Sequence, residues 1–370
     1  MSSLAGPAGP VHVGMDTSKN TIMAAVLWPG EEVPVTERVV NDEPPVRRLL
    51  DRVAGAAGGR GYLRCCYEAG PGGYDLYRLL EAMGIACDVV APSLIPRRAG
   101  DRVKTDRRDS VRLVRLHRAG ELTAVRVPSR QEEAVRDLVR ARGAILDDRK
   151  RAQQRLTAVL MRHGRVWRGP SYWTRAHRDW IAAQKFAEPA LAAAVASCRA
   201  ALATRETELA AIEAQLLPWA GRDPLAGTVA RLACYRGIAE LTGLTLAAEV
   251  TDWRRFPCAR AFMGFTGLCP AEYSSGDKTS RGHITKAGPR TVRTALTEAA
   301  WAYRHAPAIG AALRRRQAGA DPGTLARSWK AQRRLHDRYL HLVTHGKTPP
   351  EAITAIAREL AGFTWAEMTS

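Results

Sequence analysis

The sequence lacks several features that would point to a secreted, membrane or zinc-stabilised protein. Its seven cysteines include no pair with Cys-x-x-Cys spacing, so neither a zinc site nor a disulfide framework is indicated. No run of about 18 apolar residues occurs, and we therefore expect no membrane span. The chain begins without a basic segment ahead of an apolar core, and we expect no signal peptide. These absences predict a cytoplasmic protein with reduced thiols.

Acidic residues are also scarce relative to basic ones. The 370 residues contain 56 Lys and Arg against 37 Asp and Glu, a formal net charge of +19. Such an excess favours a polyanionic partner, most simply nucleic acid, although a basic solvated surface would produce the same count. Arginine makes up most of the excess, and its guanidinium group can bind phosphate oxygens in pairs.

Residues 1–125 show an ordered series of short apolar runs and amphipathic stretches. Three apolar runs are followed by stretches that alternate between helix and strand character. We predict strands at 11–16, 21–28, 33–40, 61–67 and 85–90, and helices at 44–56, 73–83 and 106–119. Three consecutive strands followed by alternating helices and strands is the order of a ribonuclease H-like α/β domain.

Four acidic residues lie on or directly after these predicted strands and helices. Asp16 lies on the first strand, Glu68 follows the fourth, and a pair three residues apart lies in a basic helix, at Asp106 and Asp109. An i,i+3 spacing places both helical carboxylates on one face. Each acid alone is also compatible with a turn or a surface ion pair. Together they would repel each other unless a divalent cation held them, and hard oxygen ligands suit Mg2+. Two such ions promote in-line displacement at a phosphodiester.

Residues 126–220 are rich in Ala, Arg, Glu, Gln and Leu, with apolar positions at helical spacing. A stretch that contains Trp, Gly and Pro, at 167–180, divides this region in two. We therefore predict a hairpin of two long helices with coiled-coil character. The heptads are imperfect, so dimerisation through this hairpin is one interpretation and packing within a single chain is the other.

Residues 221–370 are predicted to form an α-helical domain with basic helices towards the end of the chain. Two short helices within 228–250 are joined at Arg236-Gly237-Ile238. This pattern resembles a helix-hairpin-helix element, whose turn amides can hold a DNA phosphate. Ala239 stands where that element usually has a second glycine, and an ordinary helical hairpin explains the pattern equally well.

A polar segment at 267–293 combines hydroxyl groups, glycines and cations. Ser274 and Ser275 precede Gly276, and five cations follow, at Lys278, Arg281, Lys286, Arg290 and Arg293. A hydroxyl beside so many cations can attack a phosphate, because the cations stabilise charge on the attacked group. Composition alone favours the alternative, a phosphate-binding loop without a covalent role.

The segments DTSK, YEAGPGGY and KTDRRD, with RFPCARAFMGFTGLCPAEYSSGDKTSRGHITKAGPRTVRTAL, resemble the transposases of the insertion-sequence-110 family, which includes the Piv-type DNA invertases. The resemblance is clearest over residues 11–120 and 225–305. It implies a RuvC-like domain with four acids (DEDD), a helical hairpin that supports oligomers, and a smaller helical transposase domain. It also implies magnesium bound by the acids, a covalent phosphoserine–DNA intermediate, and a noncoding bridge RNA that pairs with donor and target DNA.

Carried onto this sequence, the resemblance assigns the catalytic, metal-binding acids to Asp16, Glu68, Asp106 and Asp109. It assigns the nucleophile to Ser275, with Ser274 as the alternative one residue earlier. Nucleic-acid contacts are expected from the flanking cations: Arg97, Arg98, Arg102, Lys104, Arg107, Arg108, Lys278, Arg281, Lys286, Arg290 and Arg293. The family's usual Gly-Asn-Arg reads Gly-Pro-Arg here, with Pro289 in the middle, so any role of that asparagine amide is missing.

The prediction is therefore an RNA-guided DNA recombinase that works as an oligomer, a dimer or tetramer, at the bacterial nucleoid. One alternative is a metal-dependent, structure-specific nuclease resembling a junction resolvase, which uses water in place of the serine. The other is a basic nucleic-acid-binding protein without catalytic activity.

Overall fold

The computed structural model describes residues 9–92, 95–96, 105–275 and 278–370, and the side chains of residues 273–281 lie outside this description. The chain divides into two compact units, Met1–Val127 and Pro128–Ser370. The first unit is a mixed α/β domain, and the second is mainly helical. No helix in the described part of the chain is both long and apolar enough to cross a membrane.

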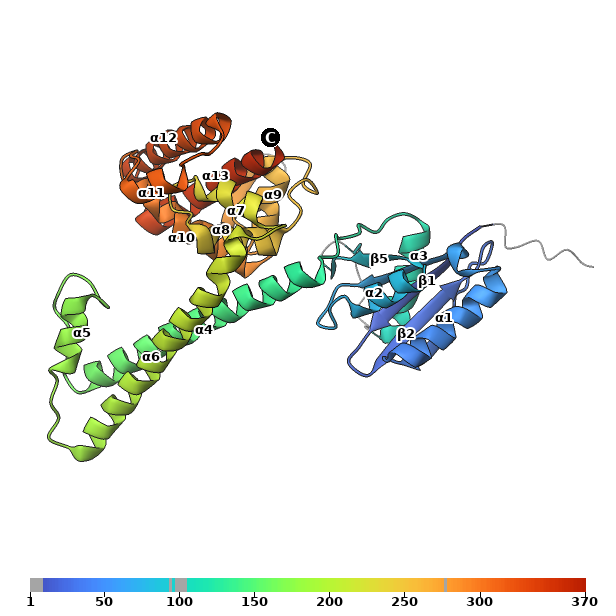
Figure 1. The fold of residues 1–370 in the computed structure, drawn as a ribbon, viewed down its shortest axis with the longest axis horizontal. Helices are drawn as coiled ribbons and strands as arrows, with labels where there is room; N and C mark the ends of the chain where they lie inside the picture. The colour runs from blue at the N-terminus through green and yellow to red at the C-terminus, as the bar shows by residue number, and fades with distance from the viewer. Residues whose placement is uncertain (1–8, 93–94, 97–104, 276–277) are drawn as a thin grey trace, which may run out of the picture. The chain divides into compact units, whose positions relative to one another are not determined.

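The first unit is built on a five-stranded sheet in the order β3-β2-β1-β4-β5 (Figure 1). The antiparallel neighbours are β1 with β2 and β2 with β3, whereas β4 runs parallel to β1 and β5 parallel to β4. This arrangement agrees with the ribonuclease H-like order predicted from the sequence. The strands are β1 (Val11–Thr17), β2 (Thr21–Leu27), β3 (Val35–Val40), β4 (Leu63–Glu68) and β5 (Ala86–Val90).

Alternate residues of β1 face opposite sides of the sheet, as the twofold period of a strand requires. Val11, Val13 and Met15 are buried in a cluster with side chains of α1 (Glu43–Ala57) and α2 (Asp75–Ala82). Burial of each such side chain contributes about 1.5–3 kcal/mol. The opposite face of the sheet packs against α3 (Asp106–Arg118).

A glycine in β1 allows α3 to pack directly on the sheet. A Cβ atom at Gly14 would lie 2.6 Å from the backbone nitrogen of Val114 and 2.8 Å from the carbonyl oxygen of Ser110. No side chain fits in this space, so backbone lies against backbone. The position of α3 over β1 is therefore fixed by the main chain itself.

The second unit begins with two long helices that pack along each other (Figure 1). These are α4 (Arg130–Arg162) and α6 (Pro189–Leu216), and an Arg142–Glu213 ion pair of 2.6 Å links them. Between them in the chain, α5 (Arg175–Ala182) shares a buried cluster with both helices. The pair corresponds to the helical hairpin predicted for residues 126–220, with an additional helix at its end.

The rest of the second unit surrounds a buried core that includes Tyr235, Phe262, Leu296 and Ile356. Its helices are α7 (Ala226–Ala233), α8 (Glu240–Val250), α9 (Ala259–Thr266), α10 (Arg290–Ala300), α11 (Ala311–Arg316), α12 (Pro322–Thr344) and α13 (Pro349–Thr369). Short 3-10 helices lie at Leu217–Gly221 and Trp301–Arg304 in this unit, and another lies at Arg60–Tyr62 in the first unit.

A two-stranded antiparallel ribbon also belongs to this unit, β6 (Pro270–Ser275) and β7 (Lys278–Ile284). The sequence predicted an α-helical domain with a polar segment at this place, and the ribbon is an addition to that helical architecture. Its strands consist mostly of polar and charged residues, so they lack the alternating apolar pattern that identifies a strand.

Candidate metal and nucleic-acid site

The register of β1 and β4 places two of the predicted acids side by side. Gly14 pairs with Cys66 in this parallel ladder, and Asp16 and Glu68 each follow two residues later. Residues two apart in a strand face the same side, and Cys66 Sγ lies 3.8 Å from the Leu113 carbonyl oxygen of α3. Asp16 and Glu68 therefore lie on the α3 side of the sheet, at the carboxyl ends of adjacent strands.

The other two acids lie in the first turn of α3, which runs antiparallel to β1. Near its end, His117 approaches His12 of β1, with 3.3 Å between the two Nδ1 atoms. The first turn must then lie towards the other end of β1, which carries Asp16. Thr105 caps α3 by accepting a hydrogen bond from the Arg108 amide. The structure thus brings all four carboxylates to one face and one end of the sheet.

One of these acids has a buried oxygen without a hydrogen-bond partner. Asp109 is only 9% exposed, and its Oδ1 lies 3.4 Å from the Arg112 guanidinium. Its Oδ2 has no hydrogen-bond partner within the described part of the chain. An unpartnered buried carboxylate oxygen is unfavourable, and a cation would satisfy it.

Arg38, on β3, is a residue that the sequence analysis missed. Its guanidinium lies 3.8 Å from Asp106 Oδ2. The register explains this proximity, because Asp16 pairs with Met23 on β2, and Met23 pairs with Arg38 on β3. A period-two pattern on β3 could have indicated the face on which Arg38 lies, but its proximity to the acids depends on pairing between distant segments.

The four side chains do not form a closed metal cage in this conformation. Within the described residues, no group of three or more His, Cys, Asp or Glu side chains is close enough to hold a metal ion. In chemical terms the set fits a divalent cation, since it offers hard carboxylate oxygens, one of them buried without a partner.

The residues that were predicted to contact nucleic acid differ in exposure and in their partners within the protein. Arg107, Arg108 and Lys286 are exposed, and Arg290 is exposed but forms a 3.0 Å ion pair with Asp147. Arg293 instead donates hydrogen bonds within the protein, to the carbonyl oxygens of Thr266 and Ala287. Arg97, Arg98, Arg102 and Lys104 lie outside the described residues, as do the side chains of Lys278 and Arg281.

The predicted nucleophile lies at the end of the β6–β7 ribbon. Ser275 is the last residue of β6 and pairs with Lys278, while Ser274 pairs with Thr279. Their side chains are outside the description. Two glycines with positive φ fix the other end of the ribbon, because a Cβ at Gly267 would lie 2.1 Å from the Ala287 carbonyl oxygen. At Gly288 the corresponding contact would be with the Phe265 carbonyl oxygen, at 1.9 Å.

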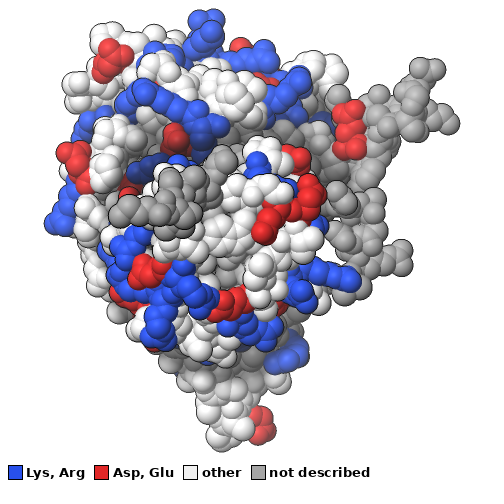
Figure 2. Space-filling view, turned by 90° about the vertical axis from the view of Figure 1, so that its right-hand side faces the viewer, with Lys and Arg blue, Asp and Glu red and all other residues white. Residues whose placement is uncertain are grey.

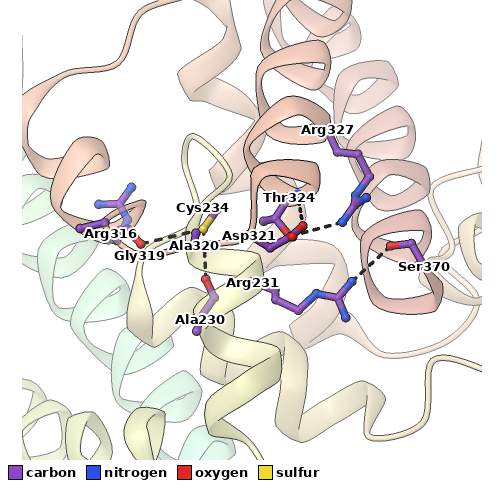
Figure 3. A pocket seen from close by; sticks show the side chains of 11 residues that line it. Ala230, Arg231, Cys234, Arg316, Gly319, Ala320, Asp321, Thr324, Arg327 and Ser370 are labelled. Atoms are coloured by element: carbon purple, nitrogen blue, oxygen red, sulfur yellow. Dashed lines mark hydrogen bonds between the residues drawn. The ribbon is translucent and has the colours of Figure 1, made fainter.

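A cavity of about 490 Å3 lies elsewhere in the second unit, between α7, α12 and the end of α13 (Figure 3). Arg231, Arg316 and Arg327 line it and give it the appearance of an anion site. Each of these guanidinium groups already has partners within the protein, however. Arg231 and Arg327 both bind Glu367, at 2.9 and 2.6 Å, and Arg316 donates to the Ala233 carbonyl oxygen.

Glu367 links the helices around this cavity. Burial favours its neutral form, but hydrogen bonds from Arg327, Thr324 and Arg231 outweigh burial and lower the pKa of Glu367 to about 2. Tyr235 adds a hydrogen bond of 3.1 Å to the same carboxylate. The cluster is best explained as a structural element that joins α7, α12 and α13.

Many cationic side chains are visible on the face of the molecule drawn in Figure 2. Figure 2 shows Lys and Arg gathered at several places on the face in view, with smaller groups of acidic residues among them. This distribution agrees with the excess of basic residues in the sequence and suits contact with an extended polyanion.

A mixed sheet that carries acids at the ends of two adjacent strands, with two more on the covering helix, is consistent with a ribonuclease H-like domain of the DEDD type. Comparison with known proteins agrees. The DEDD domain model of IS110 transposases, described as "Transposase", matches residues 13–164, and the model described as "Transposase IS116/IS110/IS902 family" matches residues 229–314.

Two individual relatives that match most of the chain support the same family. It is 40% identical over 98% of its length to the putative transposase y4qE of Sinorhizobium fredii, of which the match covers 93%. It is 31% identical over 90% of its length to the transposase for insertion sequence element IS1533 of Leptospira borgpetersenii, of which the match covers 96%. The chain belongs to the IS110 family of transposases.

Proposed function

We propose that this transposase cuts and rejoins DNA strands by phosphoryl transfer, with Asp16, Glu68, Asp106 and Asp109 as the ligands of Mg2+. The observation that carries this proposal is the unpartnered, buried Oδ2 of Asp109, in the first turn of the helix that covers Asp16 and Glu68. Both family matches support a DNA-recombining enzyme, and the DEDD domain suits divalent metal chemistry.

We further propose that Ser275 is the nucleophile. Its hydroxyl attacks the phosphorus of a DNA phosphodiester, an Oγ–P bond forms, and the bond to the leaving strand breaks as that oxygen takes up a proton. A hydroxyl at another strand end then attacks the phosphoserine, which restores Ser275 and joins the strands. The number of phosphoester bonds is conserved, so no external energy source is needed. When bound, Mg2+ stabilises the charge that develops on the attacked phosphate.

In this mechanism Arg38 positions the phosphate that is attacked. Its guanidinium lies beside Asp106 and can approach a phosphate held by the acids. Arginine binds phosphate oxygens with a planar pair of donors, which would orient the scissile group for in-line attack.

We also propose that a noncoding bridge RNA selects the donor and target DNA and that the active complex is a dimer or tetramer. Base pairing would supply the sequence specificity, while the protein binds backbones. The net charge of +19 and the exposed Arg107, Arg108 and Lys286 support contact with nucleic acid.

The test is a strand-transfer reaction with labelled DNA, Mg2+ and RNA transcribed from the noncoding DNA beside the gene. Denaturing gels should show a DNA strand linked to protein, and Ser275→Ala should abolish both the link and the exchange. Ser274→Ala, the matched control, should retain both. Cleavage without a protein-linked strand would instead identify a nuclease that uses water. Retention of every activity in Asp106→Asn/Asp109→Asn would exclude the metal site.

A further inference from the structure

The end of the α4–α6 hairpin contains an aromatic cluster around one buried histidine. His177 is 2% exposed, and the ring centroids of Trp167, Tyr172, Trp173 and Trp180 lie 5.3, 4.9, 5.0 and 5.8 Å from its own. Aromatic contacts at these separations are favourable beyond the area that they bury.

Hydrogen bonds and close packing hold these rings in place. The Trp173 amide donates to His177 Nδ1 at 2.8 Å, and Trp167 Nε1 donates to the Ser171 carbonyl oxygen at 3.1 Å. The Trp167 ring also lies over Gly169, where an added Cβ would be 2.2 Å from a ring carbon. Rings that are already fixed lose little conformational entropy when a ligand stacks on them.

Part of this cluster is exposed to solvent together with neighbouring apolar side chains. Tyr172 is 49% exposed, Met161 61% and Val166 40%. We call the surface formed by residues 161–188 the hairpin tip. These side chains line one small hollow together with Trp167, and contiguous exposed apolar groups are a feature of binding surfaces.

The hairpin tip is strongly basic. Against two acids, Asp179 and Glu188, it has six cationic residues, namely Arg162, Arg165, Arg168, Arg175, Arg178 and Lys185. Arg178 is paired with Glu206 on α6, at 2.7 Å. Arg162, Arg168 and Lys185 are exposed and form no ion pair with any described residue.

We propose that the hairpin tip binds single-stranded nucleic acid, with Tyr172 stacking on an unpaired base and Arg162, Arg168 and Lys185 binding the adjacent phosphates. Exposed rings beside cations are the combination that single-stranded polynucleotides require, because every base has a flat face and every linkage a charge. A duplex does not offer unstacked bases and should bind more weakly. A second copy of the tip is disfavoured as the partner, since the two surfaces carry the same sign of charge. This inference does not depend on the metal or serine chemistry.

The test uses the full chain and 12-nucleotide oligomers of uridine and of thymidine, with a mixed-sequence duplex as comparison. Fluorescence anisotropy measures affinity, and photocrosslinking through 5-iodouracil, followed by mass spectrometry, identifies the residue beneath the base. We expect crosslinks to Tyr172 or Trp167. Tyr172→Ala should weaken binding about tenfold, whereas Tyr172→Phe should bind within twofold of the original chain. The uridine and thymidine arms distinguish RNA from DNA.

Two further variants keep the result interpretable. Tyr62→Ala removes a tyrosine of similar exposure, 46%, in the first unit and should leave the affinity unchanged. Arg168→Ala should reduce the salt dependence of binding by about one phosphate contact. The proposal is overturned if Tyr172→Ala and Arg168→Ala both match Tyr62→Ala in affinity and the crosslinks fall outside residues 161–188. It is also overturned if Tyr172→Ala changes only the sedimentation of the protein, because the occupant would then be a second copy.

Discussion

Gly14 of β1 lies directly against Ser110 of α3, so that a methyl group on the glycine would be 2.8 Å from the Ser110 carbonyl oxygen. Gly14→Ala should therefore force α3 away from the sheet and destabilise the first unit by about 1–3 kcal/mol. Urea unfolding monitored by circular dichroism measures this change. Because Asp106 and Asp109 begin the same helix, strand exchange should decrease as well.

Gly55→Ala is the matched control for this substitution. Gly55 lies within α1, is exposed, and has no atom within 4 Å of the position that a Cβ would occupy. Alanine is favoured over glycine in a helix by about 0.5–1 kcal/mol, so this variant should be slightly more stable than the original chain. Equal effects of the two variants would show that the contact with α3 is not tight.

Metal binding should be measurable through the thermal stability of the protein. At a free Mn2+ concentration 100 times the dissociation constant, binding to the folded state alone stabilises by about 2.7 kcal/mol. Asp109→Asn should lose this metal-dependent rise in melting temperature, because its buried oxygen becomes part of a neutral amide. Asp88→Asn changes an acid that pairs with His117 on the same side of the sheet and should retain the rise. A rise that persists in Asp109→Asn would place the metal elsewhere.

Glu367 should make the stability of the second unit depend on pH. Its pKa is lowered to about 2 in the folded state, against 4.5 for an ordinary glutamate. The resulting stabilisation, about 3 kcal/mol, is present above pH 4.5 and is lost as the pH falls towards 2. Urea midpoints over this range should decrease steeply for the original chain. In Glu367→Gln they should start lower and change less, because the group no longer titrates.

His177 should produce a second pH effect, at the hairpin tip. Burial lowers its pKa below 6.5, with a smaller contribution from Arg178, so the ring is neutral and Nδ1 accepts the Trp173 amide. The neutral His177 ring contributes its full stabilisation above pH 6.5. This stabilisation is lost as the pH falls through the lowered pKa of His177, because protonation removes the hydrogen-bond acceptor. Tryptophan fluorescence should report the change. His177→Asn keeps an acceptor that does not titrate, and its fluorescence should stay constant over the same range.

Much of the first unit could be predicted from the sequence, because its signals are local. The apolar runs at 11–16 and 21–28 became β1 and β2 with small changes at their ends, and the predicted helix at 106–119 became α3. The placement of Asp16 and Glu68 on neighbouring strands followed from the expected topology. Alternation of side chains along β1 then put both acids on the side of α3.

Other features depend on contacts between distant residues and have no local signal. The fit of Gly14 against α3 and the approach of Arg38 to Asp106 arise only when the sheet has formed. Charge alone also does not show which partners a cation has within the protein, since Arg293 donates to the carbonyl oxygens of Thr266 and Ala287. The segment at 167–180 was interpreted as a break between helices, whereas its aromatic residues pack around His177.

The contact of Gly14 with α3 has a mechanical consequence. At its centre there is no rotatable side chain that could yield when the helix is pulled. A bound polynucleotide that pulls on α3 would therefore also pull on β1. The helix and the strand would move together as one rigid body. The backbone separation between Asp16 and Asp109 would then be preserved, and only their side chains would have to rotate for the carboxylates to meet at a cation.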